Sequence, residues 1–203
     1  MDLTLVLLVL GFVAGICDAQ SKKPKKLTEH VDVWNDFLDR SDTFFVMKRS
    51  FYRNDEANKM NCEYMTVLKK DPQSYSFDGL WGSLKNNEYT KHVLNGSATT
   101  DASTQRRRMA VAFGGLSSKE YKYRVLYGDG EGCNVFKLIS APEKHKSWEG
   151  NCELWATKER APRVDENSLC YQEYQRICKG KPDAETPYGQ HCTQPPKEVI
   201  PAC

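Results

Sequence analysis

The stretch YKYRVLYGDGEGCNVFKLIS, residues 121–140, contains two runs in which side chains of different polarity alternate. Alternate residues of a β-strand point to opposite faces. One face of the first run carries Tyr121, Tyr123, Val125 and Tyr127. The other face carries Lys122 and Arg124. Because the DGEG segment between the runs is rich in turn-forming residues, the stretch predicts two neighbouring antiparallel strands.

The tyrosines of the first run are expected to point into the protein, because the charged face must contact water. A buried tyrosine hydroxyl needs a hydrogen-bond partner, which a sealed core of Leu, Ile and Val does not provide. Several inward tyrosines therefore favour a cavity that retains water or a polar ligand. The alternative is a filled interior in which neighbouring polar groups bond the hydroxyls.

Six further runs show the same period of two residues. They are TFFVMKRSFY (43–52), CEYMTVLK (62–69), SYSFDGLW (74–81), EYTKHVL (88–94), RMAVAF (108–113) and CELWAT (152–157). Eight short runs separated by Gly, Asn, Asp and Pro predict a mainly β protein, an antiparallel meander or barrel.

Two helices are predicted outside these runs. In LTEHVDVWNDFL (27–38) the apolar residues are spaced by four, three and four positions, which is one face of a short amphipathic helix. That face comprises Leu27, Val31, Trp34 and Leu38. Thr28 is available as the N-cap. SLCYQEYQRICKG (168–180) predicts a second helix that ends near Gly180.

The first residues of the chain indicate secretion. Leu5 to Ile16 form an uncharged apolar run of 12 residues, too short to span a bilayer, which is typical of a signal peptide over residues 1–19. Cleavage after Ala19 removes two acidic and no basic residues, so the net charge rises only from +2 to +4. Such a mild charge predicts neither a nucleic-acid partner nor a membrane partner. We expect one ligand-binding domain over residues 20–194 and a Pro-rich tail over 195–203.

The cysteine count predicts disulfides in an oxidising compartment. Loss of Cys17 with the leader leaves seven cysteines: 62, 133, 152, 170, 178, 192 and 203. At most three bridges can form, so the expected monomer has one odd cysteine that could instead link a dimer. There is no C-x-x-C motif, and the four histidines lack metal-ligand spacing, so neither a metal nor another cofactor is expected. Asn95-Gly96-Ser97 is a glycosylation sequon.

The run CELWAT places an acid inside a predicted strand. Glu153 and Trp155 share one face, and Cys152 and Leu154 share the other. If Trp155 points inward, Glu153 does too, and Cys152 lies on the outer wall, where it can reach either Cys178 or Cys203. A buried carboxylate has a raised pKa or a cationic or hydrogen-bonding partner. In a barrel with an interior ligand, that partner could be a bound ammonium group.

The order of several motifs resembles the tick salivary histamine-binding proteins, which are tick lipocalins. The motifs are DVW (32–34), YRND (52–55), CNV (133–135), ELW (153–155) and the cysteine-bearing C-terminal helix. The resemblance implies an eight-stranded antiparallel lipocalin barrel with a short N-terminal helix and a C-terminal helix packed outside. It implies the disulfides Cys62–Cys192 and Cys133–Cys170. It also implies a protein without catalytic activity, secreted in saliva, that sequesters host histamine or serotonin and suppresses inflammation.

The resemblance also implies an amine site. Tyr52 and Asp55 match the tyrosine and aspartate of the family's inner site, Glu153 matches the glutamate of its second site, and Trp155 follows as in the family. We expect Tyr121 to form a further wall of the site. Other acids of the family's sites have no counterpart here. Their places fall near Asn95 and Gly96, at Arg40 and at Asn134.

Three functions are compatible with these residues. The first is a sink for a biogenic amine. The second is a sink for a lipid mediator, such as a leukotriene or fatty acid. If Tyr52 points inward, Lys48 does too, and it would bind the carboxylate of such a ligand. A bulge between Lys48 and Tyr52 would instead turn Lys48 outward. Glu153 could also pair with an inward Lys48. The third is a barrel that binds a host protein. No nucleophile, base and orienting group occur together, so an enzyme is not expected.

Overall fold

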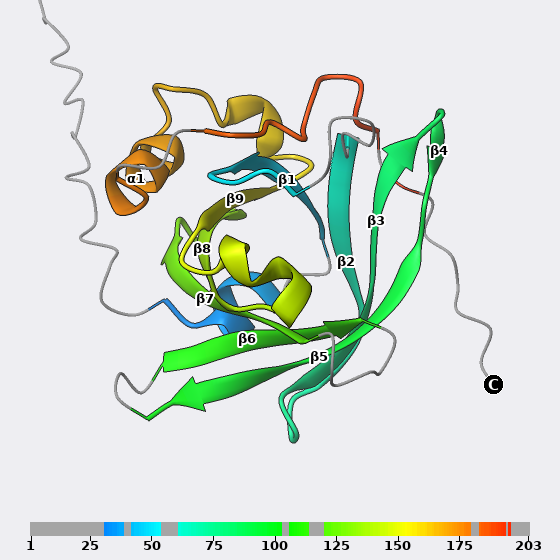
Figure 1. Ribbon diagram of the computed structural model, residues 1–203, viewed down its shortest axis with the longest axis vertical. Helices are drawn as coiled ribbons and strands as arrows, with labels where there is room; N and C mark the ends of the chain where they lie inside the picture. Colours follow the sequence, from blue (N-terminus) through cyan, green and yellow to red (C-terminus); the bar gives the residue numbers. More distant parts are fainter. Residues whose placement is uncertain are drawn as a thin grey trace, which may run out of the picture.

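The computed structural model describes residues 31–38, 42–53, 61–102, 106–113, 120–179, 183–193 and 195 (Figure 1). The strands are β1 (Thr43–Arg49), β2 (Asn61–Asp71), β3 (Ser76–Lys85), β4 (Glu88–Tyr89), β5 (His92–Asp101), β6 (Arg106–Phe113), β7 (Glu120–Gly128), β8 (Cys133–Ser140) and β9 (Cys152–Thr157). The helical segments are η1 (Trp34–Leu38), η4 (Glu143–Trp148), η5 (Ala161–Arg163) and α1 (Leu169–Ile177). The predicted leader lies outside the described residues.

The strands form one antiparallel sheet that closes on itself. Its order is β2-β1-β9-β8-β7-β6-β5-β3-β4, and β2 also pairs with β3. This extra pairing joins eight strands into a ring, with the two-residue β4 added beside β3. Closure leaves the eight strands of the ring without an unpaired edge. The prediction of an eight-stranded antiparallel lipocalin-like barrel is therefore confirmed.

The predicted strand at 88–94 is divided into β4 and β5. Thr90 causes the break, because its hydroxyl accepts a hydrogen bond from the backbone N–H of Ser83 at 3.0 Å. Strand β5 then continues to Asp101, well past the predicted end. The sequon residue Asn95 thus lies within a strand, where its exposed side-chain amide donates to Asp78 at 2.6 Å. Its glycosylation stays a prediction.

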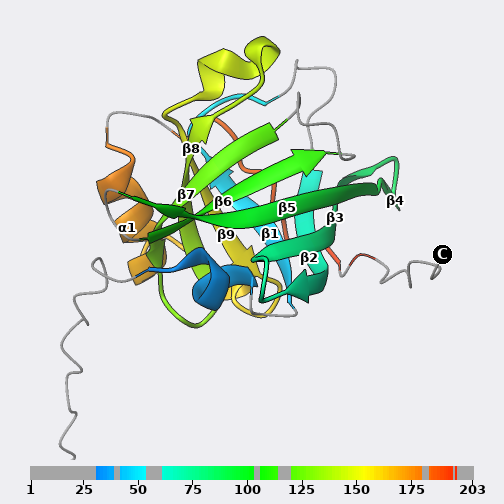
Figure 2. The ribbon, with the colours of Figure 1, turned by 90° about the horizontal axis from the view of Figure 1, so that it is seen from below.

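Helical segments lie at opposite ends of the barrel, η1 at one and η4 at the other (Figures 1 and 2). Val31, Trp34 and Leu38 are buried, as predicted, but η1 covers only Trp34–Leu38, so Val31 precedes the helical segment. Phe37, which the predicted helical spacing omits, is fully buried as well. Its ring packs against Phe44, Phe136 and Trp155. Leu27 and Thr28 lie outside the described residues.

The second predicted helix is α1, which packs on the outside of the barrel against β7, β8 and β9. It begins after Ser168, whose side chain accepts a hydrogen bond from the N–H of Tyr171. Three disulfides join the C-terminal part of the chain to the strands: Cys62–Cys192, Cys133–Cys170 and Cys152–Cys178. The first two are the pairs that the resemblance implies, and Cys178 is the partner found for Cys152. No helix within the described ranges is long and apolar enough to cross a membrane.

Two β-bulges decide which side chains enter the barrel. The register of β1 shifts between Val46 and Lys48, so that Lys48 pairs with Leu154 and Arg49 pairs with Glu153. The register of β7 shifts between Val125 and Tyr127. A bulge adds one residue to a strand and reverses the alternation beyond it.

The bulge in β7 corrects one orientation expected from the sequence. Tyr121, Tyr123 and Val125 belong to the interior cluster, as predicted. Tyr127 instead packs in the outer cluster, together with Tyr174 of α1 and the cysteines of the wall. Burial raises the pKa of Tyr127 to about 12. Strict alternation fails here because Tyr127 follows the bulge.

We predict that the Cys152–Cys178 bond stabilises the barrel wall. The bond closes a loop with a sequence separation of 26 residues, so the double variant Cys152→Ala/Cys178→Ala should lose about 3 kcal/mol of unfolding free energy. Chemical denaturation of both proteins measures the loss. Because both partners are replaced, no new free thiol arises. Peptide mapping of the non-reduced wild type should recover residues 152 and 178 in one linked species, and a 152–203 species would contradict the pairing.

Candidate ligand-binding site

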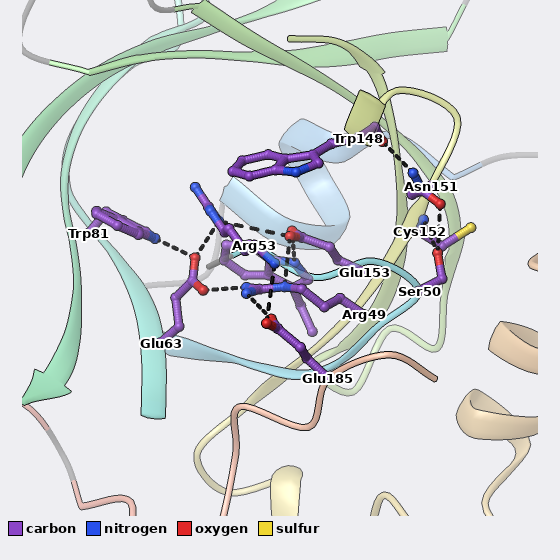
Figure 3. A network of polar contacts seen from close by, with 11 residues as sticks. Arg49, Ser50, Arg53, Glu63, Trp81, Trp148, Asn151, Cys152, Glu153 and Glu185 are labelled. Atoms are coloured by element: carbon purple, nitrogen blue, oxygen red, sulfur yellow. Dashed lines mark hydrogen bonds and ion pairs between the residues drawn. The ribbon is translucent and has the colours of Figure 1, made fainter. Parts of the chain in front are cut away.

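Five charged side chains gather at the end of the barrel near η4 (Figure 3). They are Arg49 at the end of β1, Arg53 just after it, Glu63 on β2, Glu153 on β9 and Glu185 from the C-terminal segment. We call this group the charge cluster. The side chains of Arg49, Glu63 and Glu153 are fully buried, and those of Arg53 and Glu185 are nearly so. Buried charges require compensation by partners.

Arg49 lies at the centre of the charge cluster. Its guanidinium binds Glu63, donates to Glu185 at 2.9 Å, and lies 3.4 Å from Glu153. The backbone also holds Glu185 in place, because the N–H of Arg49 donates to the Glu185 carbonyl at 3.0 Å. Burial by itself would lower the pKa of Arg49, but the charges of Glu63 and Glu153 outweigh it and raise that pKa. Arg49 therefore stays charged.

Glu63 and Glu153 differ in how well they are bonded. Glu63 accepts hydrogen bonds from Arg49, from Arg53 and, at 2.7 Å, from the Trp81 indole. Burial tends to raise the pKa of Glu63, but the charges of Arg49 and Arg53 outweigh it and hold the pKa below its usual range. Glu63 is thus a buried carboxylate that stays ionised.

Glu153 is bonded through only one of its oxygens. Its Oε2 accepts from the indole of Trp155 at 2.9 Å. Its Oε1 is buried, has no hydrogen-bond partner among the described residues, and lies 3.4 Å from Nε of Arg49 and 3.8 Å from a guanidinium nitrogen of Arg53. Burial raises the pKa of Glu153, and the two arginine charges do not offset this. This oxygen can still accept a hydrogen bond.

The guanidinium of Arg53 is surrounded by aromatic rings. It lies 5.0 Å from the ring of Trp81, 5.8 Å from that of Tyr121 and 5.7 Å from that of Trp148. Segment η4 supplies Trp148 and also His145, whose ring stacks on Trp148 and whose Nδ1 is hydrogen-bonded to the Tyr121 hydroxyl. Aromatic faces and a carboxylate are the groups that bind organic cations.

Comparison with known proteins now identifies the family. The sequence matches the family model described as tick histamine binding protein over residues 21–194. The chain belongs to the tick histamine-binding protein family. Among curated protein sequences, none is significantly similar.

One solved structure with a TM-score above 0.5 shows the same fold. A crystal structure of AM182 in complex with serotonin has a TM-score of 0.54 and 18% sequence identity, over 77% of this chain and 88% of AM182. A deswapped triple mutant of bovine odorant binding protein has a TM-score of 0.43 and 7% identity, over 66% of this chain and 80% of that one. At 18% identity the likeness to AM182 shows the fold alone.

The structure brings together three of the residues expected in the site of this histamine-binding family member. Glu153 and Trp155 point into the barrel and are bonded to each other, as their shared face predicts. Tyr121 lies next to the Arg53 guanidinium. Asp55 lies outside the described residues. That Glu153, Trp155, Tyr121 and Asp55 contact a ligand stays a proposal.

Tyr52 and Lys48 are placed differently from the expectation. Tyr52 is 70% exposed, and its neighbours Phe51 and Arg53 are the buried ones. Lys48 points to the outer wall, where it pairs with Asp183 at 3.6 Å and lies over the ring of Tyr171. The predicted inward orientation of Lys48 is therefore wrong. The bulge after Val46 is the physical reason, since it exchanges Lys48 for Arg49 on the inner face.

Most of the charge cluster is not predicted from the sequence, namely Arg49, Arg53, Glu63 and Glu185, and neither is Trp81. One signal could have found Glu63: once Cys62 is assigned to the outer wall, its neighbour must point inward. Among the residues that the structure describes, two groups of potential metal-ligand atoms occur, Cys62/His191/Cys192 and Asp129/Cys133/Cys170. The cysteines of both groups are disulfide-bonded and offer no thiolate.

We predict that Arg49 is essential to the barrel. Arg49→Met removes the central cation and leaves Glu63 and Glu153 to share only the Arg53 guanidinium, so the free energy of unfolding at neutral pH should fall by about 3–5 kcal/mol. Arg176→Met is the matched control, because Arg176 forms an exposed ion pair with Glu173 and should cost under about 1 kcal/mol. Urea denaturation measures both.

The loss in Arg49→Met should shrink as the pH falls. Burial already raises the pKa of Glu153 in the wild type; without Arg49 it rises further, and the depressed pKa of Glu63 rises as well, so protonation at acidic pH costs the folded variant less than the wild type. In the wild type, the stabilisation from Glu63 is lost as the pH falls through that residue's depressed pKa. A difference between the two proteins that stays constant from neutral to acidic pH would contradict this role of Arg49.

Proposed function

We propose that this protein is a secreted lipocalin that sequesters a small biogenic amine with one ammonium group, of the serotonin type. The observation that carries the proposal is the composition of the charge cluster. It holds three carboxylates, Glu63, Glu153 and Glu185, but only two guanidinium groups, Arg49 and Arg53. The interior end of the barrel is therefore more favourable for a cation than for an anion.

The chemistry of Glu153 supports an amine ligand. Its Oε1 is buried, accepts no hydrogen bond among the described residues, and lies 3.8 Å from the Arg53 nitrogen that also binds Glu63. An ammonium group loses hydration when it enters the barrel, and a carboxylate with a free acceptor oxygen offsets that cost. Rings such as Trp155 and Tyr121 bury the apolar part of an arylalkylamine. The serotonin complex of AM182, which shares the fold, is consistent with such a ligand.

A lipid mediator fits the site less well. The carboxylate of a fatty acid or leukotriene needs an interior cation, and Lys48 lies on the outer wall. Within the described part of the chain, both arginines of the charge cluster are already bound to carboxylates. An incoming carboxylate would have to displace one of these while adding to a negative excess. Binding of a host protein on the barrel's surface is the remaining alternative.

Secretion and the effect on the host are part of the proposal. The predicted leader at 1–19 precedes the family match, which begins at residue 21. Three disulfides suit an oxidising extracellular compartment. A secreted binder without catalytic activity removes a mediator in proportion to its own amount, which would suppress host inflammation. The odd cysteine of the mature chain, Cys203, lies outside the described residues, so a monomer or a dimer linked through Cys203 stays a prediction.

Calorimetric titration of the mature protein with serotonin, histamine and a leukotriene tests the proposal. We expect serotonin to bind. Glu153→Gln keeps an acceptor for Trp155 but removes the charge, so it should weaken serotonin binding by at least about 30-fold, equivalent to roughly 2 kcal/mol. Asp55→Asn tests the second acid that the resemblance implies, and binding weakened in that variant would add Asp55 to the site.

The control is Glu120→Gln. Glu120 is a surface acid paired with Lys122, so this substitution removes the same charge outside the barrel. It should leave serotonin binding unchanged. Leukotriene binding without amine binding would overturn the proposal in favour of the lipid alternative, and Lys48→Ala would show whether the outer wall is involved. Absence of binding by all three ligands would favour a protein partner.

A further inference from the structure

Arg53 and Arg49 have different positions in the charge cluster. Arg49 belongs to β1, is fully buried and contacts all three carboxylates. Arg53 lies four residues beyond the end of β1, and its guanidinium has Glu63 as its close ionic partner, with Glu153 3.8 Å away. If the Arg53 guanidinium left, Glu63 would still be bonded to Arg49 and to Trp81. Arg49 is thus structural, whereas the place of Arg53 can be taken by another cation.

The surroundings of the Arg53 guanidinium have the chemistry of an organic-cation site. Trp81 on β3, Tyr121 on β7 and Trp148 in η4 present ring faces to it, and Glu63 supplies the opposite charge. We call these four residues the aromatic cage. Three aromatic faces with a carboxylate bind alkylammonium ions through cation–π and ionic attraction. Figure 3 shows the Trp148 ring and Trp81 on either side of Arg53.

The aromatic cage also has the geometry for one ammonium group. The Arg53 nitrogen that binds Glu63 is the same atom that lies 3.8 Å from Glu153 Oε1, which accepts no hydrogen bond among the described residues. A primary ammonium at this position can donate to both carboxylates, because it has three N–H groups. A second cation beside Arg53 would be repelled by its charge, and the ring faces are already covered. An amine therefore gains most by replacing Arg53.

We propose that Arg53 is an internal substitute for the ligand, and that an arylalkylammonium ion binds in the aromatic cage by displacing the Arg53 guanidinium. This inference rests on the proposed function and adds the position of the ammonium group and the residue that competes with it. The ligand's intrinsic affinity is then multiplied by the fraction of molecules in which Arg53 has left the aromatic cage, so the apparent affinity is lower. Residue 53 thereby sets the amine concentration at which the protein becomes loaded.

Calorimetry with serotonin on Arg53→Ala tests the competition. Removal of the competing cation should tighten serotonin binding at least about ten-fold relative to wild type. Arg176→Ala, which removes an exposed arginine of α1, should leave the affinity unchanged. Arg53→Met, which keeps an apolar stem, provides a second variant in case Arg53→Ala does not fold. In the wild type the Trp148 ring holds both competitors, so Trp148→Ala is added to the Arg53 variant, where it should weaken serotonin binding by about ten-fold through loss of one ring face.

Ethylguanidinium chloride provides a readout that does not depend on serotonin. This ion has the shape of the end of the Arg53 side chain, so it should raise the melting temperature of Arg53→Ala and leave that of the wild type unchanged, with sodium chloride at equal ionic strength as the reference. In Arg53→Ala, serotonin should compete with ethylguanidinium. Equal responses of the two proteins would overturn the proposed occupancy of the aromatic cage.

The outcomes separate this inference from the proposed function. If wild type binds serotonin and Arg53→Ala binds it equally or more weakly, displacement is overturned and the proposed function stands. If Trp148→Ala, added to an Arg53 variant, leaves its serotonin binding unchanged, the position in the aromatic cage is overturned, again without loss of the proposed function. If neither wild type nor Arg53→Ala binds an amine, both the function and the displacement are overturned.

Discussion

The buried bonds of Arg49 to Glu63 and Glu185 and its close approach to Glu153 are the constraint on which the rest of the structure depends. Two acids inside a barrel would each protonate or force the interior open unless a cation entered with them. The guanidinium of Arg49 on β1 compensates the carboxylates of two other strands, Glu63 on β2 and Glu153 on β9. The same residue binds the C-terminal segment through Glu185. The polar interior and the wall outside it are therefore fixed by one side chain.

A charged interior of this kind favours ligand binding over a sealed core. Replacement of such clusters by apolar residues often stabilises a protein, so their presence at one end of the barrel is better explained by recognition than by stability. On the proposed function, the excess carboxylate favours cations, and the rings of Trp81, Tyr121 and Trp148 provide faces that suit an organic cation. Arg53 occupies that place in the structure and compensates Glu63.

The outer wall has a separate structural role. The disulfides of Cys62, Cys133 and Cys152 lie on the outer faces of their strands and join the C-terminal part of the chain to the barrel. In β2 and β9 the residue after the cysteine is an inward carboxylate, Glu63 or Glu153. Each cysteine therefore fixes the face of the neighbouring acid as well as the position of the C-terminal segment. In these strands the disulfides lie on the outer face and the carboxylates lie on the inner face.

The sequence by itself determined the number and direction of the strands in the barrel, the position of α1, and the inward orientation of Glu153 and Trp155. Alternation with a period of two carries that information as long as a strand is regular. Tertiary structure alone decided that Lys48 lies outside, that Arg49 lies inside and that Tyr127 leaves the interior. These positions follow bulges, and a bulge is set by the pairing of a strand with its neighbours, which a single run of residues does not record. The partners of Glu153 depended on the same register, because Arg49 reaches Glu153 only when the two strands pair as they do.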